Sequence, residues 1–183
     1  ARFKTLMFQI NWKVKSLLYK IFSLFKLYKF LFFVQKRITK RTNINFQHHL
    51  YYWDYHYKYL KENNSKKILE IGAGKSLAQN IYLSYRFDRK IEQTLIDVTN
   101  MFDLDLFNNA NDQISKILKV DRFPSANSIN DLKKNYNLNY LAPMNLKNVE
   151  ESNLQFDACI SSSTLEHLPT VELEKNFYLL KKI

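Results

Sequence analysis

The chain has 183 residues, of which 46% are hydrophobic and 25% charged, a balance typical of a globular protein with room for one domain and a substantial core. Its net charge of +11 comes from the first part of the chain, because residues 1–53 contain eleven Lys or Arg and no Asp or Glu, whereas residues 54–183 contain seventeen of each. The single cysteine, Cys159, excludes an internal disulfide and a cysteine-bound metal cluster, and is compatible with a reducing compartment.

The first segment, residues 6–41, is basic and aromatic and contains no Gly or Pro. One helical face is predicted from the spacing of its apolar residues, which are Leu17, Ile21, Leu24, Tyr28 and Leu31. Lysines interrupt this face, so it falls short of the roughly 18 uncharged residues of a spanning helix. Two interpretations stay open: a helix lying on an anionic membrane surface, or one that covers the domain or a partner subunit. Nucleic acid is not expected as a partner, because no motif of a nucleic-acid-binding domain accompanies the basic charge.

The second segment, residues 42–64, is crowded with aromatic rings and is predicted to contain a helix that ends near Leu60. Three of the four histidines lie in it, namely His48, His49 and His56. They do not share a helix face with a carboxylate at ligand spacing, so we predict packing or substrate contact and no metal site. We therefore predict a basic, aromatic-rich helical arm over residues 1–64 and a separate domain over residues 65–183.

The domain begins with KKILEIGAGKS at residues 66–76, which indicates a strand that runs into a tight turn. Gly72 and Gly74 are the only glycines of the chain, and Glu70 is the acid before the turn. Glycines are needed where the backbone bends sharply or where a ligand comes close. A helix is predicted next, over residues 76–85, with its N-terminus toward that ligand.

A second strand is predicted over residues 91–98 and carries Asp97 near its tip, 25 residues beyond Gly72. In a βαβ unit an acid at this place faces the ligand held over the first turn, where it can accept both hydroxyl protons of a ribose. Such a unit serves dinucleotides and other nucleosides. Ser76 stands where a dinucleotide fingerprint has its next glycine or close helix contact, which favours another nucleoside.

The remaining elements are predicted in chain order. They are a loop at 108–112, a helix at 113–120, a break at Pro124, a helix at 129–136, a strand at 138–142, a loop with Asn145, a strand at 156–162, a turn at 164–169 and a helix at 171–183. Ligands of open α/β sheets bind outside the carboxyl ends of the strands. The residues expected at that edge are Gly72, Gly74, Asp97, Asn145 and Ser162.

Three motifs in order, ILEIGAGKS, LID and FDACISSSTLEHLP, resemble those of class I S-adenosylmethionine-dependent methyltransferases of the small-molecule, type 11-like group. The resemblance covers residues 66–183. It implies an α/β, Rossmann-like parallel sheet and S-adenosylmethionine as cofactor. The family sheet continues beyond the helix that begins near Val171, so about four strands are expected here. Strand five onward is expected to be missing, in a chain that is a fragment or a truncated relative.

The resemblance also assigns the cofactor-binding residues, which are Glu70, Gly72, Ala73, Gly74, Asp97, Val98, Asn145, Ser161, Ser162 and Ser163. It implies that the glycine turn approaches the methionine part, that Glu70 steadies the turn and the ammonium side, and that Asp97 binds the ribose. The three serines would form the floor of the cofactor pocket. Asn145 stands where the family usually has an aspartate that accepts from the adenine amino group, and its side-chain oxygen can accept one bond without the charge.

Catalysis would need a base only if the methyl acceptor must lose a proton, and Glu166 and His167 are the candidates. Either residue can instead hold the loop or cap the next helix. The catalytic motifs of DNA methyltransferases are absent, so a small-molecule, glycan or lipid-linked methyl acceptor is expected. We predict a cytoplasmic protein, peripheral at the inner face of a membrane if the arm binds lipid. The alternative is a non-catalytic nucleoside-binding or interaction module.

Overall fold

The computed structural model describes residues 46–162 and 164–183. The helix predicted over residues 6–41 lies outside the described residues, as does Ser163. Residues 45–183 form one of two compact units of the chain.

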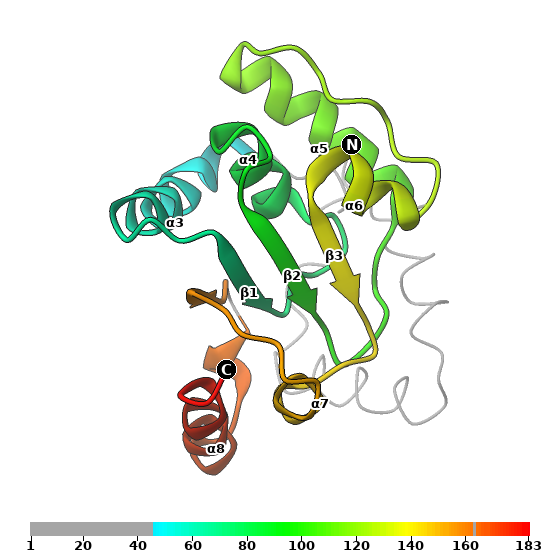
Figure 1. The fold of residues 1–183 in the computed structure, drawn as a ribbon. Helices are drawn as coiled ribbons and strands as arrows, with labels where there is room; N and C mark the ends of the chain where they lie inside the picture. Colours follow the sequence, from blue (N-terminus) through cyan, green and yellow to red (C-terminus); the bar gives the residue numbers. More distant parts are fainter. Residues whose placement is uncertain (1–45, 163) are drawn as a thin grey trace, which may run out of the picture. The chain divides into compact units, whose positions relative to one another are not determined.

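A four-stranded parallel sheet forms the centre of the described unit, with the strand order β3-β2-β1-β4 (Figure 1). The strands are β1 (Lys67–Ile71), β2 (Glu92–Ile96), β3 (Leu138–Leu141) and β4 (Ala158–Ile160). The helices are η3 (Phe46–His48, a 3-10 helix), α3 (Leu50–Glu62), α4 (Ala78–Arg86), α5 (Leu104–Leu118), α6 (Asn130–Tyr136), α7 (Leu146–Glu151), η4 (Leu165–His167, also 3-10) and α8 (Thr170–Leu180). Parallel strands need crossover connections, and the helices between the strands supply them. The predicted α/β, Rossmann-like fold with about four parallel strands is confirmed.

Helices cover both faces of the sheet. Successive residues of a strand point to opposite faces, and in β1 Glu70 bonds to Asn80 of α4, whereas Leu69 packs with Leu146 and Val149 of α7. Helix α4 in turn packs against α3 and α5, and α7 packs against α8. Figure 1 shows α7 and α8 apart from the group formed by α3, α4 and α5.

Helix α3 packs with the sheet unit. The ring centroids of Trp53 and Tyr82, a residue of α4, lie 5.8 Å apart, and Leu60 at the end of α3 is fully buried. Asp54 accepts a hydrogen bond from the Tyr82 hydroxyl at 3.0 Å and pairs with Arg86 at 3.6 Å. The unit therefore begins at Asn45, earlier than the boundary predicted after residue 64.

The predicted loop at residues 108–112 is wrong, because α5 runs through it. Asp103 caps the helix by accepting from the Leu106 N–H at 2.9 Å, and Phe107 is fully buried. Asparagines favour turns when their side chains compete for the backbone. Here Asn108 bonds instead to both backbone groups of Ala126, each at 2.9 Å, so these polar residues attach the helix to the following loop.

Candidate functional site

The glycine turn lies at the carboxyl end of β1 and closes onto β2, since the Gly72 N–H donates to the Ile96 carbonyl at 2.8 Å. Both glycines have positive φ, 77° at Gly72 and 74° at Gly74. A Cβ at Gly72 would lie 2.0 Å from the Thr164 Oγ1, whereas a Cβ at Gly74 would meet no atom of the described residues within 4 Å. Gly72 is thus required by packing against the loop after β4. Gly74 faces open space, as a backbone approached by a ligand would.

Asp97 follows β2 and presents a buried carboxyl group. Its Oδ1 accepts from the Thr99 N–H at 3.4 Å, while its Oδ2 is buried and has no hydrogen-bond partner among the described residues. Burial raises the pKa of this carboxyl, and the backbone N–H groups of Thr99, Gly74 and Val98 partly oppose the rise. A buried acceptor without a donor costs free energy, so the arrangement suits a ligand that brings a hydroxyl to Oδ2.

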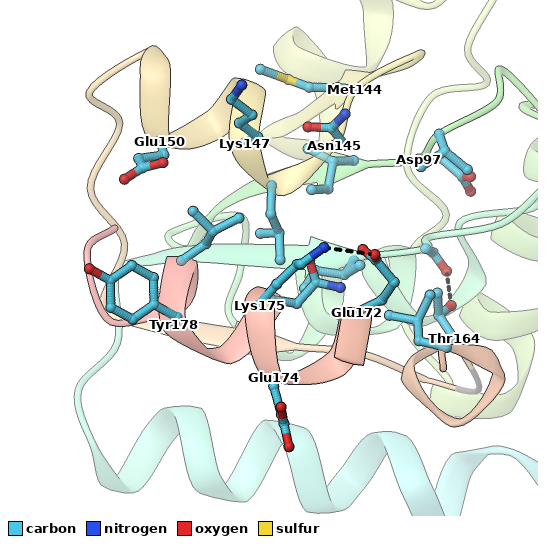
Figure 2. A pocket seen from close by; sticks show the side chains of 18 residues that line it. Asp97, Met144, Asn145, Lys147, Glu150, Thr164, Glu172, Glu174, Lys175 and Tyr178 are labelled. Carbon is cyan, nitrogen blue, oxygen red and sulfur yellow. Dashed lines mark hydrogen bonds and ion pairs between the residues drawn. The ribbon is translucent and has the colours of Figure 1, made fainter. Parts of the chain in front are cut away.

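A cavity of about 780 Å³ lies between α7 and α8, beside the ends of β1 and β2. It brings together four of the predicted cofactor residues, Gly72, Asp97, Val98 and Asn145. Figure 2 shows Asp97 and Thr164 at one end, and Glu150 and Tyr178 at the other. Its volume falls in the range of small-molecule and cofactor sites.

Several cavity residues were not predicted from the sequence. The apolar ones are Ile71, Ile96, Met144, Leu146, Leu168 and Leu179, and the charged ones on α7 and α8 include Lys147, Glu150, Glu172 and Lys175. Glu172 and Lys175 pair with each other at 3.2 Å. Met144 and Leu146 flank the predicted Asn145 in the sequence, and this position next to a predicted site residue could have indicated them. The α8 residues become neighbours only when that helix packs on α7.

Asn145 has a structural role that the sequence analysis missed. It is the N-cap of α7: its Oδ1 accepts from the Asn148 N–H at 3.1 Å, and the Asn148 Oδ1 accepts from the Asn145 N–H at 3.2 Å. This reciprocal pair is a capping box. The side-chain oxygen expected to serve a ligand is therefore already bonded to the helix, and the group turned away from the cap is the amide nitrogen.

The serines at the end of β4 stabilise the turn. Ser161 Oγ donates to the Ile71 carbonyl at 3.0 Å, and Ser162 Oγ donates to the Gln79 Oε1 on α4 at 2.7 Å. These two serines do not line the cavity, and neither do Ala73 and Gly74. Ser161 and Ser162 thus act by holding β4 against the turn and the start of α4.

Glu70 faces α4 and belongs to a buried polar network. The Asn80 amide donates to its Oε2 at 2.5 Å and also to the Gln93 Oε1 at 3.2 Å. The Gln93 amide continues to the Ser84 hydroxyl at 2.9 Å, and Ser84 donates to the Tyr136 carbonyl at 2.8 Å. Glu70 does not line the cavity. Its carboxyl group therefore contacts α4, the helix that follows the turn.

Complete burial raises the pKa of Glu70 to about 7, although the amides of Asn80 and Gln79 act in the opposite direction. The folded state then binds more protons than the unfolded state between pH 4.5, the ordinary value, and about 7. Stability therefore falls as the pH rises through this window.

We expect Glu70→Gln to remove this loss, because a neutral amide carries no ionisation cost. The shift corresponds to at most about 3 kcal/mol, so the variant should exceed the wild type in free energy of unfolding by up to ~3 kcal/mol at pH 8 and by little at pH 4.5. Urea unfolding across this range measures it. The control is Glu92→Gln, which makes the same charge change on an exposed side chain paired with Lys133; it should follow the wild-type pH profile. Parallel profiles for all three proteins would contradict the prediction.

The two candidate bases lie outside the cavity. Glu166 and His167 sit on η4 with exposed side chains, and His167 Nε2 lies 3.6 Å from Glu166 Oε1. Their neighbours Thr164 and Leu168 do line the cavity. The segment therefore contributes to the cavity wall through residues other than the two predicted for catalysis.

Comparison with known proteins gives no match: no family model fits the chain, and no curated protein or solved structure is significantly similar. Helices of the described part are all too short or too polar to cross a bilayer.

Proposed function

We propose that this chain binds S-adenosylmethionine and transfers its methyl group to a small-molecule, glycan or lipid-linked acceptor. The observation that carries the proposal is the buried Asp97 Oδ2, which has no partner among the described residues and shares a cavity with Gly72 and Asn145. An acid at the tip of β2, across from a glycine turn after β1, fits a ribose. The resemblance of the three sequence motifs to those of class I methyltransferases favours S-adenosylmethionine among the nucleosides.

The residues present fit this cofactor at three places. Asp97 offers an acceptor to the ribose hydroxyls, and Gly72 lines the same cavity at the turn, where its backbone would approach the methionine part. Val98 and Asn145 line the wall where the adenine ring of the cofactor would lie. The bound cofactor supplies an activated methyl on its sulfonium, so the chain's own task is to hold an acceptor in line and exclude water.

Calorimetry with S-adenosylmethionine and S-adenosylhomocysteine on the full chain tests the binding part. Saturable heat with both ligands supports the proposal, and no heat with either would overturn it. Transfer is tested by S-adenosylhomocysteine formation in the presence of lipid and glycan extracts. A nicotinamide dinucleotide should bind much more weakly than either ligand.

One observation favours the alternative, a non-catalytic nucleoside-binding module. The cavity contains neither Glu166 nor His167, and both side chains are exposed. A module of this kind would bind S-adenosylmethionine and S-adenosylhomocysteine but form no product with any extract. Methyl transfer to an acceptor that is already deprotonated needs no base, so the exposed pair does not by itself oppose catalysis.

Asn145→Asp should tighten binding. A carboxylate caps a helix as well as an amide does and still has a second oxygen as acceptor for the adenine amino group. One added hydrogen bond to a charged group predicts roughly tenfold higher affinity for S-adenosylhomocysteine. Asn148→Asp is the matched control, because it places the same charge in the same capping box on a residue outside the cavity. Equal gains in affinity for the two variants would mean that the added charge alone strengthens binding. No gain in affinity for Asn145→Asp would mean that the adenine ring does not lie beside residue 145.

We further propose that the basic arm binds an anionic membrane surface at the cytoplasmic face. The support is compositional: residues 1–53 contain eleven Lys or Arg and no acid, and apolar residues are spaced along one predicted helical face. Removing residues 1–41 should abolish flotation with phosphatidylserine-containing vesicles, and high salt should weaken flotation of the full chain. Equal flotation of the two chains would contradict the proposal.

A further inference from the structure

Helix α3 has an unusual outward face. Four tyrosines lie on it, Tyr51 and Tyr52 each 64% exposed and Tyr55 and Tyr59 each 56% exposed. Tyr51, Tyr55 and Tyr59 are spaced four residues apart and therefore follow one another along the helix surface. The rings of Tyr51 and Tyr55 meet edge to face with centroids 4.9 Å apart, and their hydroxyls are hydrogen-bonded at 2.7 Å. We call these four residues the tyrosine face.

The opposite side of α3 is firmly attached, which holds the tyrosine face outward. Trp53 and Leu60 are buried, and Asp54 bonds to Tyr82 on α4. The Arg86 guanidinium lies 4.1 Å from the centroid of the Tyr57 ring. Because both apolar and charged groups fix the helix to α4, the exposed rings are presented in a set direction.

The composition of the tyrosine face suits a lipid headgroup layer as well as a protein interface, and the charge of the preceding chain decides between them. The exposed large apolar residues of α3 are all tyrosines, a residue type enriched both at protein interfaces and at membrane–water boundaries. Tyrosine has an apolar ring with a polar tip, and it gathers at the boundary between hydrocarbon and water.

The charge of the preceding chain selects an anionic surface. The stretch before Asp54 has no acidic residue and eleven basic ones. Its last basic residue, Arg41, is joined to Leu50, the first residue of α3, by a segment that spans at most about 30 Å. A bilayer that holds the arm therefore has α3 within reach.

We propose that the tyrosine face of α3 inserts into the headgroup region of an anionic bilayer, as the contact through which the described unit meets the membrane. The inference rests on the proposed membrane binding of the arm, and it does not depend on methyl transfer.

The test uses the full chain with Trp12→Phe, so that the buried Trp53 gives a constant background. Tyr55→Trp in this chain should show a blue-shifted emission and quenching by brominated lipid when vesicles of phosphatidylcholine with phosphatidylserine are added. Pure phosphatidylcholine vesicles should have a much smaller effect. The matched control is Phe177→Trp on α8, at a side chain 51% exposed in the wild type, and it should remain unquenched.

A second variant measures the strength of the contact. Serine substitutions at Tyr51, Tyr55 and Tyr59 together should lower the vesicle partition coefficient about tenfold with only a small change in the unfolding midpoint, since these rings are exposed and the pair that is lost lies on the surface. If the full chain floats but the Tyr55→Trp variant is no more quenched than the Phe177→Trp variant, the tyrosine face is not the contact and arm binding still stands. If the full chain does not float, both proposals fail. A blue shift that grows with protein concentration and needs no lipid would assign the face to a second copy of the chain and overturn the inference.

Discussion

Replacing Gly72 by alanine should destabilise the protein by about 3 kcal/mol or more, the largest stability effect that we expect from a single methyl group here. Two costs add. A φ of 77° costs an L-residue roughly 1–2 kcal/mol, and overpacking costs about 1–3 kcal/mol. The overpacking is severe, because the new Cβ would lie 2.0 Å from Thr164 Oγ1 and 2.7 Å from both Thr164 Cβ and Cγ2.

Gly74→Ala separates the two costs. Its φ of 74° gives it the same backbone strain, but its Cβ would have no neighbour within 4 Å in the described part of the chain. Urea unfolding should therefore show a loss of only about 1–2 kcal/mol. Equal losses for the two alanine variants would mean that the contact with Thr164 does not matter.

Thr164→Ala offers a rescue for the Gly72 variant. It removes the Oγ1 and Cγ2 atoms but leaves a Cβ at 2.7 Å, so the double variant should recover part of the loss. The difference from additivity measures the coupling between the glycine turn and the loop after β4. A fully additive pair would contradict the packing explanation.

The sheet was predictable because each strand is a short apolar run followed by a turn residue, and because successive parallel strands leave their carboxyl ends on one edge. The three later strands are each shorter at their ends than predicted. Helix α5 was mispredicted at Asn108, whose turn preference is outweighed by two hydrogen bonds to Ala126. Those bonds join residues 18 apart, and local spacing does not contain them.

The site was predictable where chemistry constrains a residue to one place. Gly72 is required by a positive φ, and Asp97 by its position at the tip of β2. Asn145 was placed correctly at the edge, but its cap to Asn148 depends on a short helix that the sequence analysis did not predict. The network behind Glu70 was missed because polar residues such as Asn80 become buried only when α4 packs on the sheet.

Asp97→Asn should reduce the affinity for S-adenosylhomocysteine roughly 10- to 100-fold while leaving the free energy of unfolding within about 1 kcal/mol of the wild type. The asparagine oxygen can still accept from the Thr99 N–H, so the local turn is kept. The second oxygen is replaced by an amide nitrogen, which cannot accept from a ribose hydroxyl. Calorimetry and urea unfolding on the same samples check both halves of the prediction.

Asp157→Asn is the matched control, because Asp157 lies at the opposite, amino end of the strands. Its Oδ2 accepts from the backbone N–H groups of Lys66 and Lys67 at 2.6 and 2.8 Å, and these bonds lower the pKa of the carboxyl. Removing that charge should lower the unfolding midpoint and leave ligand affinity unchanged. The two variants should thus have opposite profiles, one losing binding and the other stability. Loss of binding in both would mean that affinity follows overall stability.

Two further measurements tie the Asp97 effect to the ribose. The wild type should bind adenosine more tightly than 2′,3′-dideoxyadenosine, and Asp97→Asn should lose this preference, because the lost hydroxyls and the lost oxygen belong to the same interaction. Burial raises the pKa of Asp97 above its ordinary 3.8, so wild-type affinity should begin to fall at a higher pH than for an exposed aspartate as the solution is acidified. The asparagine variant has no proton to gain there and should bind with a flat profile. A wild type that binds both nucleosides equally would remove Asp97 from the ribose site, even if the cavity binds the cofactor in another way.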